Sequence, residues 1–184
     1  MRAACLSLAL CAAAFVPAAL VPADAHAATA PVTSVSALDL QRYAGTWHEQ
    51  ARLPLFFQRN CTGRVTATYR VRDDGLIDVV NACDTAKGRI SQAGVARRPG
   101  AAPARLEVRF APAALSFLPM VWADYWVLAL DSDYRWSLVG TPDRKYLWLL
   151  TRDADFPAAE REQVLARARA MGFDLGPLIL SNAP

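Results

Sequence analysis

The feature that most constrains the fold is a two-residue period in hydrophobicity, repeated in short segments between about residues 45 and 152. Within residues 62–72, for example, Val65, Ala67 and Tyr69 alternate with polar or charged residues. Successive side chains of a strand point to opposite sides, so this alternation indicates strands with one buried face. We therefore predict an all-β domain.

Eight such segments follow one another, separated by short turns. They cover residues 46–53, 62–72, 76–83, 87–97, 104–110, 124–131, 135–140 and 145–152. No connection supplies the helical crossover that parallel pairing needs. Sequential antiparallel strands bury their edges most simply by closing, so we predict an eight-stranded antiparallel up-and-down β-barrel, which at this size holds one small ligand. An open sandwich is the alternative.

A helical pattern follows the last strand. Val164, Leu165, Ala168 and Met171 recur at helical spacing, and Gly172 ends the segment. We predict one C-terminal amphipathic α-helix packed outside the barrel. The apolar residues 178–180 beyond it fit a ninth strand.

The N-terminus has the pattern of an export signal. Arg2 precedes a largely apolar run, and the small-x-small triplet Ala25-His26-Ala27 ends it. We predict a signal peptide over residues 1–27, with a membrane anchor as the alternative, a flexible arm over 28–37 and one barrel domain over 38–184. We find no lipobox. We therefore expect a periplasmic or secreted protein, with outer-membrane association as the alternative.

Charge and motif content exclude several function classes. The formal net charge is +3, and no run of basic residues exceeds two, so we do not expect a nucleic-acid partner. His48 is the single His outside the predicted signal peptide, and no hydrolase, dinucleotide, P-loop or zinc-protease motif occurs. A metal site from His48 and the two remaining Cys would lack the usual spacing. We therefore expect no enzyme, cofactor or metal.

Two cysteines, Cys61 and Cys83, remain outside the predicted signal peptide. A Cys pair in an exported protein is typical of a disulfide. In the predicted meander, Cys61 begins the second strand and Cys83 ends the third, at one rim. We therefore predict a Cys61–Cys83 disulfide, with two buried free thiols as the alternative.

Three short motifs resemble those of the lipocalin family: Gly45-Thr46-Trp47, Asp131-Ser132-Asp133-Tyr134, and Arg152. Over about residues 38–175 the chain resembles the bacterial group that is related to apolipoprotein D and to the plant temperature-induced lipocalins. The resemblance implies a cup-shaped barrel that carries fatty acids or lysophospholipids for membrane lipid storage or maintenance, and also homodimers. His48 and Gln50 depart from the group, which usually has Tyr and an aliphatic residue there.

The meander places the three motifs at one pole, which we predict to be closed. Trp47 would plug this pole, while Arg152 covers its ring through a cation–π contact. We assign a structural role, rather than ligand binding, to the members of this motif: Gly45, Trp47, Asp133, Tyr134 and Arg152.

The opposite pole carries a rim loop, residues 111–123, that is more apolar than a solvated loop should be. A lipid gate, a membrane contact or a dimer surface would each explain it. The alternative is a loop folded over the barrel's own core. A second function also remains open: a protein-interaction or inhibitor barrel that uses this loop, has a filled interior and binds no small molecule.

Strand alternation also predicts which side chains face the ligand cavity, although a bulge would reverse the parity of a strand. The ten predicted cavity residues are Val65, Ala67, Tyr69, Leu106, Val108, Phe110, Tyr125, Trp136, Leu138 and Trp148. Near the mouth, we expect Arg59, Tyr125 or Arg144 to meet a carboxylate or phosphate.

Overall fold

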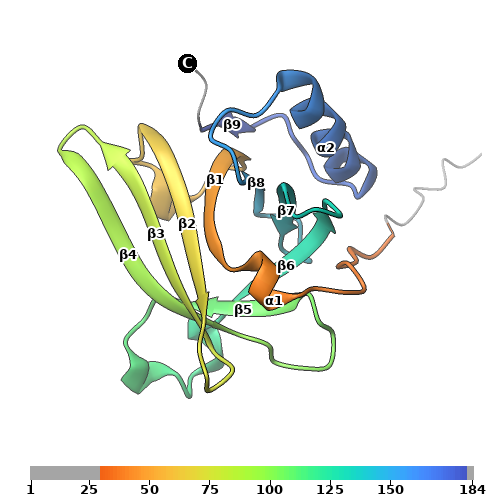
Figure 1. The fold of residues 1–184 in the computed structure, drawn as a ribbon. Helices are drawn as coiled ribbons and strands as arrows, with labels where there is room; N and C mark the ends of the chain where they lie inside the picture. Colours follow the sequence, from red (N-terminus) through yellow and green to blue (C-terminus); the bar gives the residue numbers. More distant parts are fainter. Residues whose placement is uncertain (1–29, 182–184) are drawn as a thin grey trace, which may run out of the picture.

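The computed structural model describes residues 30–181, so the signal peptide predicted over 1–27 lies outside the described residues. Nine strands make up the sheet (Figure 1). They are β1 (Gly45–Arg52), β2 (Gly63–Val71), β3 (Ile77–Thr85), β4 (Gly88–Arg97), β5 (Arg105–Arg109), β6 (Ala123–Leu130), β7 (Trp136–Gly140), β8 (Leu147–Thr151) and β9 (Ile179–Leu180). Strands β1 to β8 match the eight predicted segments to within two residues at each end.

The sheet closes on itself through β1. Residues 45–48 of β1 pair with β2, and residues 48–52 pair with β8. All neighbouring strands are antiparallel. Closure removes the exposed edges that an open sheet would present. The predicted closed barrel is therefore confirmed, and the open sandwich is wrong.

Strands β1 and β2 part in the second half of β1. A bulge between Glu49 and Ala51 redirects β1, which then pairs with β9 through Ala51 and Arg52. Figure 1 shows β1 and β2 spreading apart toward the end at which β9 lies. The connection between them contains the short 3-10 helix η1 (Phe56–Gln58). The barrel wall therefore has a gap here that side chains, rather than a backbone ladder, must fill.

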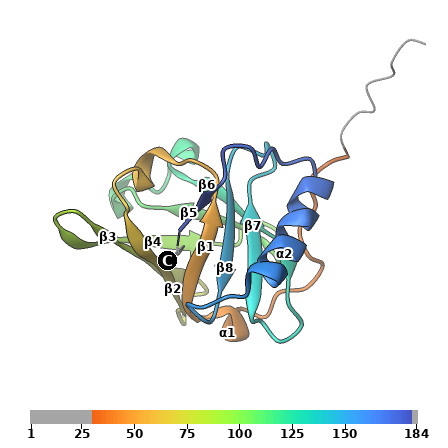
Figure 2. The same ribbon diagram turned by 90° about the horizontal axis from the view of Figure 1, so that it is seen from above.

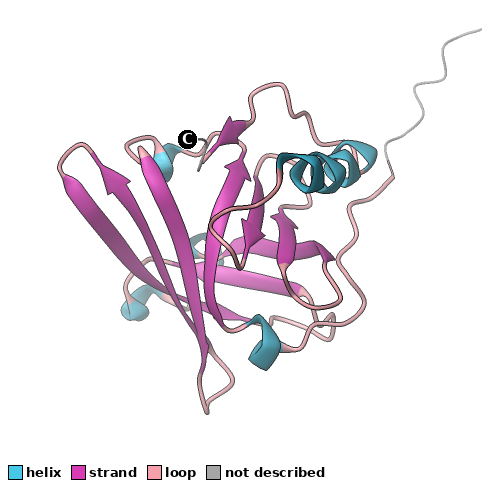
Figure 3. Ribbon diagram, turned by 45° about the horizontal axis from the view of Figure 1, so that its top comes forward, coloured by secondary structure: helices cyan, strands magenta, loops and turns pink. Residues whose placement is uncertain are grey.

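The predicted C-terminal helix is α2 (Ala158–Ala170), which lies outside the barrel beside β7 and β8 (Figures 2 and 3). Its buried residues Val164, Leu165 and Ala168 belong to one apolar cluster with Leu138 and Leu149 of the wall. None of the described helices is long and apolar enough to cross a membrane.

The prediction that Trp136 and Leu138 face the cavity is wrong. Both side chains belong to the outer cluster beneath α2, whereas Val139 belongs to the inner cluster. All five residues of β7 are buried, because α2 covers its outer face and the barrel covers its inner face. Hydrophobic alternation therefore carries no information about which side of β7 faces inward.

Residues before the barrel pack against it. Val32 is buried in the outer cluster, and the Val35 amide donates to the Val127 carbonyl at 2.9 Å. The described part of the predicted flexible arm therefore has defined contacts. The short helix α1 (Leu40–Tyr43), which we did not predict, follows this arm with Asp39 as its N-cap.

Candidate ligand cavity

The barrel encloses a cavity of about 910 Å³. This volume is in the upper part of the roughly 300–1,000 Å³ range of small-molecule sites. Eight of the ten predicted cavity residues line it: Val65, Ala67, Tyr69, Leu106, Val108, Phe110, Tyr125 and Trp148. Their contact with a ligand stays a prediction.

Sequence reasoning missed part of the lining. Tyr43 comes from α1, while Leu55, Phe57 and Gln58 come from the connection between β1 and β2. These residues lie outside the alternating segments, so the two-residue period could not find them. Asp39 belongs to a residue type that favours helix N-caps, and it is the kind of signal from which α1 could have been found.

The hydroxyl groups of three lining tyrosines are hydrogen-bonded to one another. The Tyr125 hydroxyl lies 2.9 Å from those of Tyr43 and Tyr69, and the Tyr43 hydroxyl lies 3.0 Å from Ser137 Oγ. Burial raises the pKa of Tyr43 to about 12 and raises the pKa values of Tyr69 and Tyr125 as well. The four hydroxyl groups, a tyrosine–serine chain, are therefore neutral hydrogen-bond donors at physiological pH.

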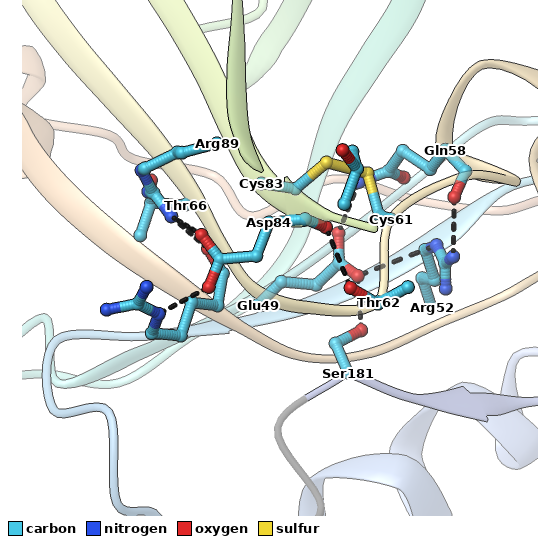
Figure 4. The surroundings of a disulfide bond; sticks show 12 residues. Glu49, Arg52, Gln58, Cys61, Thr62, Thr66, Cys83, Asp84, Arg89 and Ser181 are labelled. Atoms are coloured by element: carbon cyan, nitrogen blue, oxygen red, sulfur yellow. Dashed lines mark hydrogen bonds and ion pairs between the residues drawn. A yellow bond between two sulfur atoms is a disulfide. The ribbon is translucent and has the colours of Figure 1, made fainter. Parts of the chain in front are cut away.

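A buried polar cluster fills the gap between β1 and β2 (Figure 4). The Glu49 carboxylate accepts from Gln58 Nε2 at 2.9 Å and from the Ser181 hydroxyl, and it forms an ion pair with Arg52 at 3.6 Å. Glu49 also lines the cavity, and burial raises its pKa above the ordinary value. Trp148 Nε1 donates to Gln58 Oε1 at 3.3 Å. These contacts hold η1 against the barrel wall.

The predicted disulfide is confirmed. Cys61 and Cys83 are bonded, with their Cα atoms 5.6 Å apart, and both residues line the cavity (Figure 4). The bond ties the connection before β2 to the wall near the end of β3. Neither sulfur is free to bind a metal, so a site formed by these two cysteines and His48 is excluded.

Arg152 makes the largest number of described side-chain contacts at the closed pole. Trp47 is fully buried, and the guanidinium carbon of Arg152 lies 3.9 Å from the centre of its ring. Arg152 also donates at 2.7–3.2 Å to four backbone carbonyls, those of Arg42, Tyr43, Ala44 and Thr46. A planar guanidinium can hold several acceptors at once. Arg152 therefore joins the end of α1 to the start of β1.

The other members of the predicted closed-end motif also meet here. Gly45 has a φ of +97°, and a Cβ at this position would lie 3.2 Å from Arg152 Nη1. The Tyr134 hydroxyl accepts a hydrogen bond from the Asp39 backbone amide at 3.0 Å. Asp133 contributes its backbone amide, which donates to the Asp131 carboxylate at 3.1 Å. Asp131, rather than Asp133, therefore organises this turn.

The open pole exposes apolar side chains around the cavity mouth. Phe57 and Met120 line the cavity yet are each 84% exposed, and Phe117 is 76% exposed. The loop over residues 111–123 forms two 3-10 turns, η2 (Ala113–Leu115) and η3 (Pro119–Val121). Trp122 anchors it, because the Arg97 guanidinium lies 3.9 Å from its ring centre. The loop is thus not folded down as core.

Two of the three head-group residues predicted near the mouth are placed elsewhere. Arg144 donates to the carbonyls of Met171 and Ala30 outside the barrel, and Tyr125 belongs to the tyrosine–serine chain. Arg59 remains at the open pole, 4.1 Å from the ring centre of Phe56. The prediction failed for Arg144 because its turn packs on α2.

The two departures from the family pattern do not touch the cavity. The Gln50 amide donates to Thr151 Oγ1 at 2.9 Å and to the Ala154 carbonyl at 2.8 Å, on the outer side of β1. His48 is also absent from the described lining. Neither side chain can therefore change the cavity wall directly.

Comparison with known proteins places the chain in a family. The family model described as a lipocalin-like domain matches residues 38–183. The chain is 39% identical over 155 residues to the outer membrane lipoprotein Blc of Escherichia coli, covering 83% of this chain and 84% of that protein. The chain belongs to the lipocalin family. Temperature-induced lipocalin-1 of Arabidopsis thaliana is 36% identical over 147 residues, covering 78% of each chain.

Solved structures agree on the lipocalin fold. Insecticyanin from the tobacco hornworm Manduca sexta aligns with a TM-score of 0.65 and 21% identity, covering 85% of this chain and 87% of that one. Lipocalins bind small hydrophobic ligands and are generally carriers rather than enzymes. The cavity at the centre of this barrel is the place in which such a ligand would lie.

Proposed function

We propose that this lipocalin is an exported carrier of fatty acids or lysophospholipids, which it holds by burying the acyl chain in the barrel. The cavity of about 910 Å³, open at one pole and lined mainly by apolar side chains, is the observation that carries the proposal. Acyl burial stabilises such a complex by about 0.8 kcal/mol per CH₂ group. The proposed role is storage or maintenance of membrane lipid in the cell envelope, with periplasmic or secreted location.

Charge sets the orientation of the lipid. Among the described residues that line the cavity there is no Lys, Arg or His, whereas Glu49 and Asp124 are present. Burying a carboxylate or phosphate without a cation is costly. The acidic head group therefore stays in water at the mouth, where Arg59 is a cation without a carboxylate partner in the described chain.

One pair of neighbouring substitutions tests the cavity. Ala67 lines the cavity. The adjacent Thr68 points to the other face of β2, where its hydroxyl forms a hydrogen bond with the Thr46 hydroxyl outside the barrel. We expect Ala67→Trp to fill the cavity and weaken hexadecanoic acid binding by at least about tenfold, because the indole displaces several CH₂ groups. Thr68→Trp should bind as the wild type does. Equal affinity of both variants, measured by calorimetric titration, would contradict the proposal.

The exposed mouth suits uptake from a membrane surface. Phe57, Phe117 and Met120 are uncovered, and burying one such side chain contributes about 1.5–3 kcal/mol. We expect Phe57→Ser/Phe117→Ser to reduce co-sedimentation with phosphatidylethanolamine–phosphatidylglycerol vesicles by roughly tenfold or more. Val80→Ser, at an exposed apolar site on the outer face of β3, is the control. A wild-type dimer that dissociates in the double variant would instead assign the mouth to a second copy.

The interaction-barrel alternative predicts a filled interior and no small-molecule binding. The exposed loop over residues 111–123 is compatible with a protein partner. The open interior favours the carrier. An enzyme that uses His48 is not supported, since His48 does not reach the described lining.

A further inference from the structure

The tyrosine–serine chain of the cavity has one more hydrogen than it can use internally. Four hydroxyl groups carry four hydrogens, and the three contacts that link them consume three. No other hydrogen-bond partner of these four groups exists in the described part of the chain. One O–H group therefore has no acceptor from the protein.

This spare donor is best placed toward the cavity. Ser137 is fully buried and does not line the cavity, so an unpaired O–H there would carry the desolvation cost of an unmet hydrogen bond. Tyr43, Tyr69 and Tyr125 all line the cavity, where an incoming ligand can supply the acceptor. The arrangement is ordered by ring contacts, with Tyr43 and Tyr69 centred 5.6 Å apart and Tyr69 and Tyr125 6.0 Å apart.

A second unmet polar atom faces the same space. Asn81 lines the cavity, and its buried Oδ1 has no partner within the described chain. In the ladder between β2 and β3, Val79 is opposite Tyr69, and Asn81 is the next inward-facing residue toward the mouth. An unpartnered acceptor thus lies one step along the wall from the tyrosine that ends the hydroxyl chain.

From this unmatched donor and acceptor we infer that the cavity selects amphiphiles with a neutral oxygen, above all a hydroxyl group, at the end that enters first. A hydroxyl can accept from the tyrosine and donate to Asn81, whereas a terminal methyl group satisfies neither. An ionised group is excluded from this depth because no basic residue lines the described cavity. The inference rests on the proposed function and specifies its ligand class: acyl chains oxygenated far from the head group.

Hexadecanoic acid and its ω-hydroxy derivative test this inference. A purely apolar cavity would bind the hydroxy acid at least about tenfold more weakly, because its hydroxyl group loses water without compensation. We expect the wild-type protein to bind the hydroxy acid as tightly as hexadecanoic acid or more tightly. Calorimetric titration of the whole protein with each acid measures the ratio.

A matched pair of variants locates the effect. Tyr43→Phe/Tyr69→Phe/Tyr125→Phe/Ser137→Ala removes all four hydroxyl groups and leaves no unpaired partner, which tends to preserve stability. The affinity for the hydroxy acid, divided by the affinity for hexadecanoic acid, should fall by about tenfold or more in this variant. Tyr134→Phe removes a phenol hydroxyl at the closed pole, outside the described lining, and should keep the wild-type ratio.

The outcomes separate the inference from the proposed function. A wild-type preference for hexadecanoic acid, or an unchanged ratio in the fourfold variant, would overturn the inference while leaving the carrier intact. The wild-type ratio decides the matter even if the fourfold variant does not fold. Failure of the wild type to bind either acid would overturn the inference and the proposed function together.

Discussion

The two poles of the barrel are built in opposite ways. At the closed pole, Arg152 donates to four backbone carbonyls and covers the ring of a fully buried Trp47. At the open pole, Phe57 and Met120 are each 84% exposed. There the disulfide of Cys61 holds the connection before β2 to the wall.

This contrast shows how one barrel can exclude water at one end and admit an apolar molecule at the other. Hydrogen bonds and ring contacts can fix the closed pole because Arg152 lies over the buried ring of Trp47 and reaches four backbone carbonyls at once. The mouth must leave apolar side chains uncovered, so burial cannot hold it as firmly, and a covalent bond takes over that role. The two poles should therefore respond differently to substitution.

The largest expected effect is at the open pole. Removing the disulfide in Cys61→Ser/Cys83→Ser should lower the free energy of unfolding by about 3 kcal/mol, since the bond closes a loop of 22 residues in the unfolded chain. Urea denaturation measures this loss, and wild-type protein treated with a reductant should reproduce it. An unchanged unfolding midpoint would show that the bond does not restrain the mouth.

The second largest loss in stability is expected at the closed pole, from substitution of Arg152. Arg152→Ala takes a hydrogen-bond donor from four backbone carbonyls, of which only that of Tyr43 keeps a second side-chain donor, Trp47 Nε1, in the described chain, and it uncovers the ring of Trp47. We therefore expect a loss of roughly 2 kcal/mol in the free energy of unfolding. Arg72→Ala removes a partly exposed ion-pairing arginine and should cost no more than about 0.5 kcal/mol. Similar losses in the two variants would remove the distinction between the closed pole and the surface.

Backbone conformation gives a smaller test at the same pole. Gly45→Ala should cost about 1–2 kcal/mol, because the positive φ disfavours a side chain and the new Cβ would press on Arg152. Gly100→Ala is the control: a Cβ at this position would meet no atom within 4 Å, and the substitution should change stability by about 0.5 kcal/mol or less. A neutral Gly45→Ala would contradict the tight packing of the closed pole.

The smallest effect concerns pH at the open side of the wall. Burial raises the pKa of Glu49 above its ordinary value of 4.5, so the folded state binds this proton more firmly than the unfolded state does. The contribution of Glu49 to stability is then full below about pH 4.5 and is lost as pH rises through the raised pKa. The free energy of unfolding, measured as a function of pH, should increase for Glu49→Gln relative to the wild type over that interval.

Asp84 supplies a control of opposite sign for the pH measurement. The Arg64 guanidinium, and then Arg89, lower the pKa of this partly exposed carboxyl below its ordinary value. Its stabilising contribution is present above the ordinary value of 3.8 and is lost as pH falls through the lowered pKa. Asp84→Asn should therefore differ from the wild type most at neutral pH and least in acid. Slopes of the same sign in both variants would contradict the assignment.

Alternation in the sequence was enough to predict the barrel, because most strands have one face on the cavity and one in solvent. In β2 it correctly placed Val65, Ala67 and Tyr69 on the inner face. It failed in β7, where both faces are buried and Trp136 packs under α2. Periodicity reports a difference in environment between two faces, and β7 has no such difference.

The polar part of the candidate site could not be predicted from pattern alone. Glu49 meets Gln58, from the connection that follows its own strand, and Ser181, from near the other end of the described chain. Tyr43 reaches the cavity from a four-residue helix. These contacts depend on how the ends of strands and connections meet in space, which local propensity does not encode.

The central claim is that the barrel cavity holds an acyl chain. Native mass spectra of the protein, purified without detergent and recorded before and after addition of hexadecanoic acid, test it most directly. We predict a one-to-one lipid adduct that persists in Thr68→Trp and is lost in Ala67→Trp. A spectrum of unliganded wild-type protein after addition of the acid, or an adduct that survives in Ala67→Trp, would contradict it.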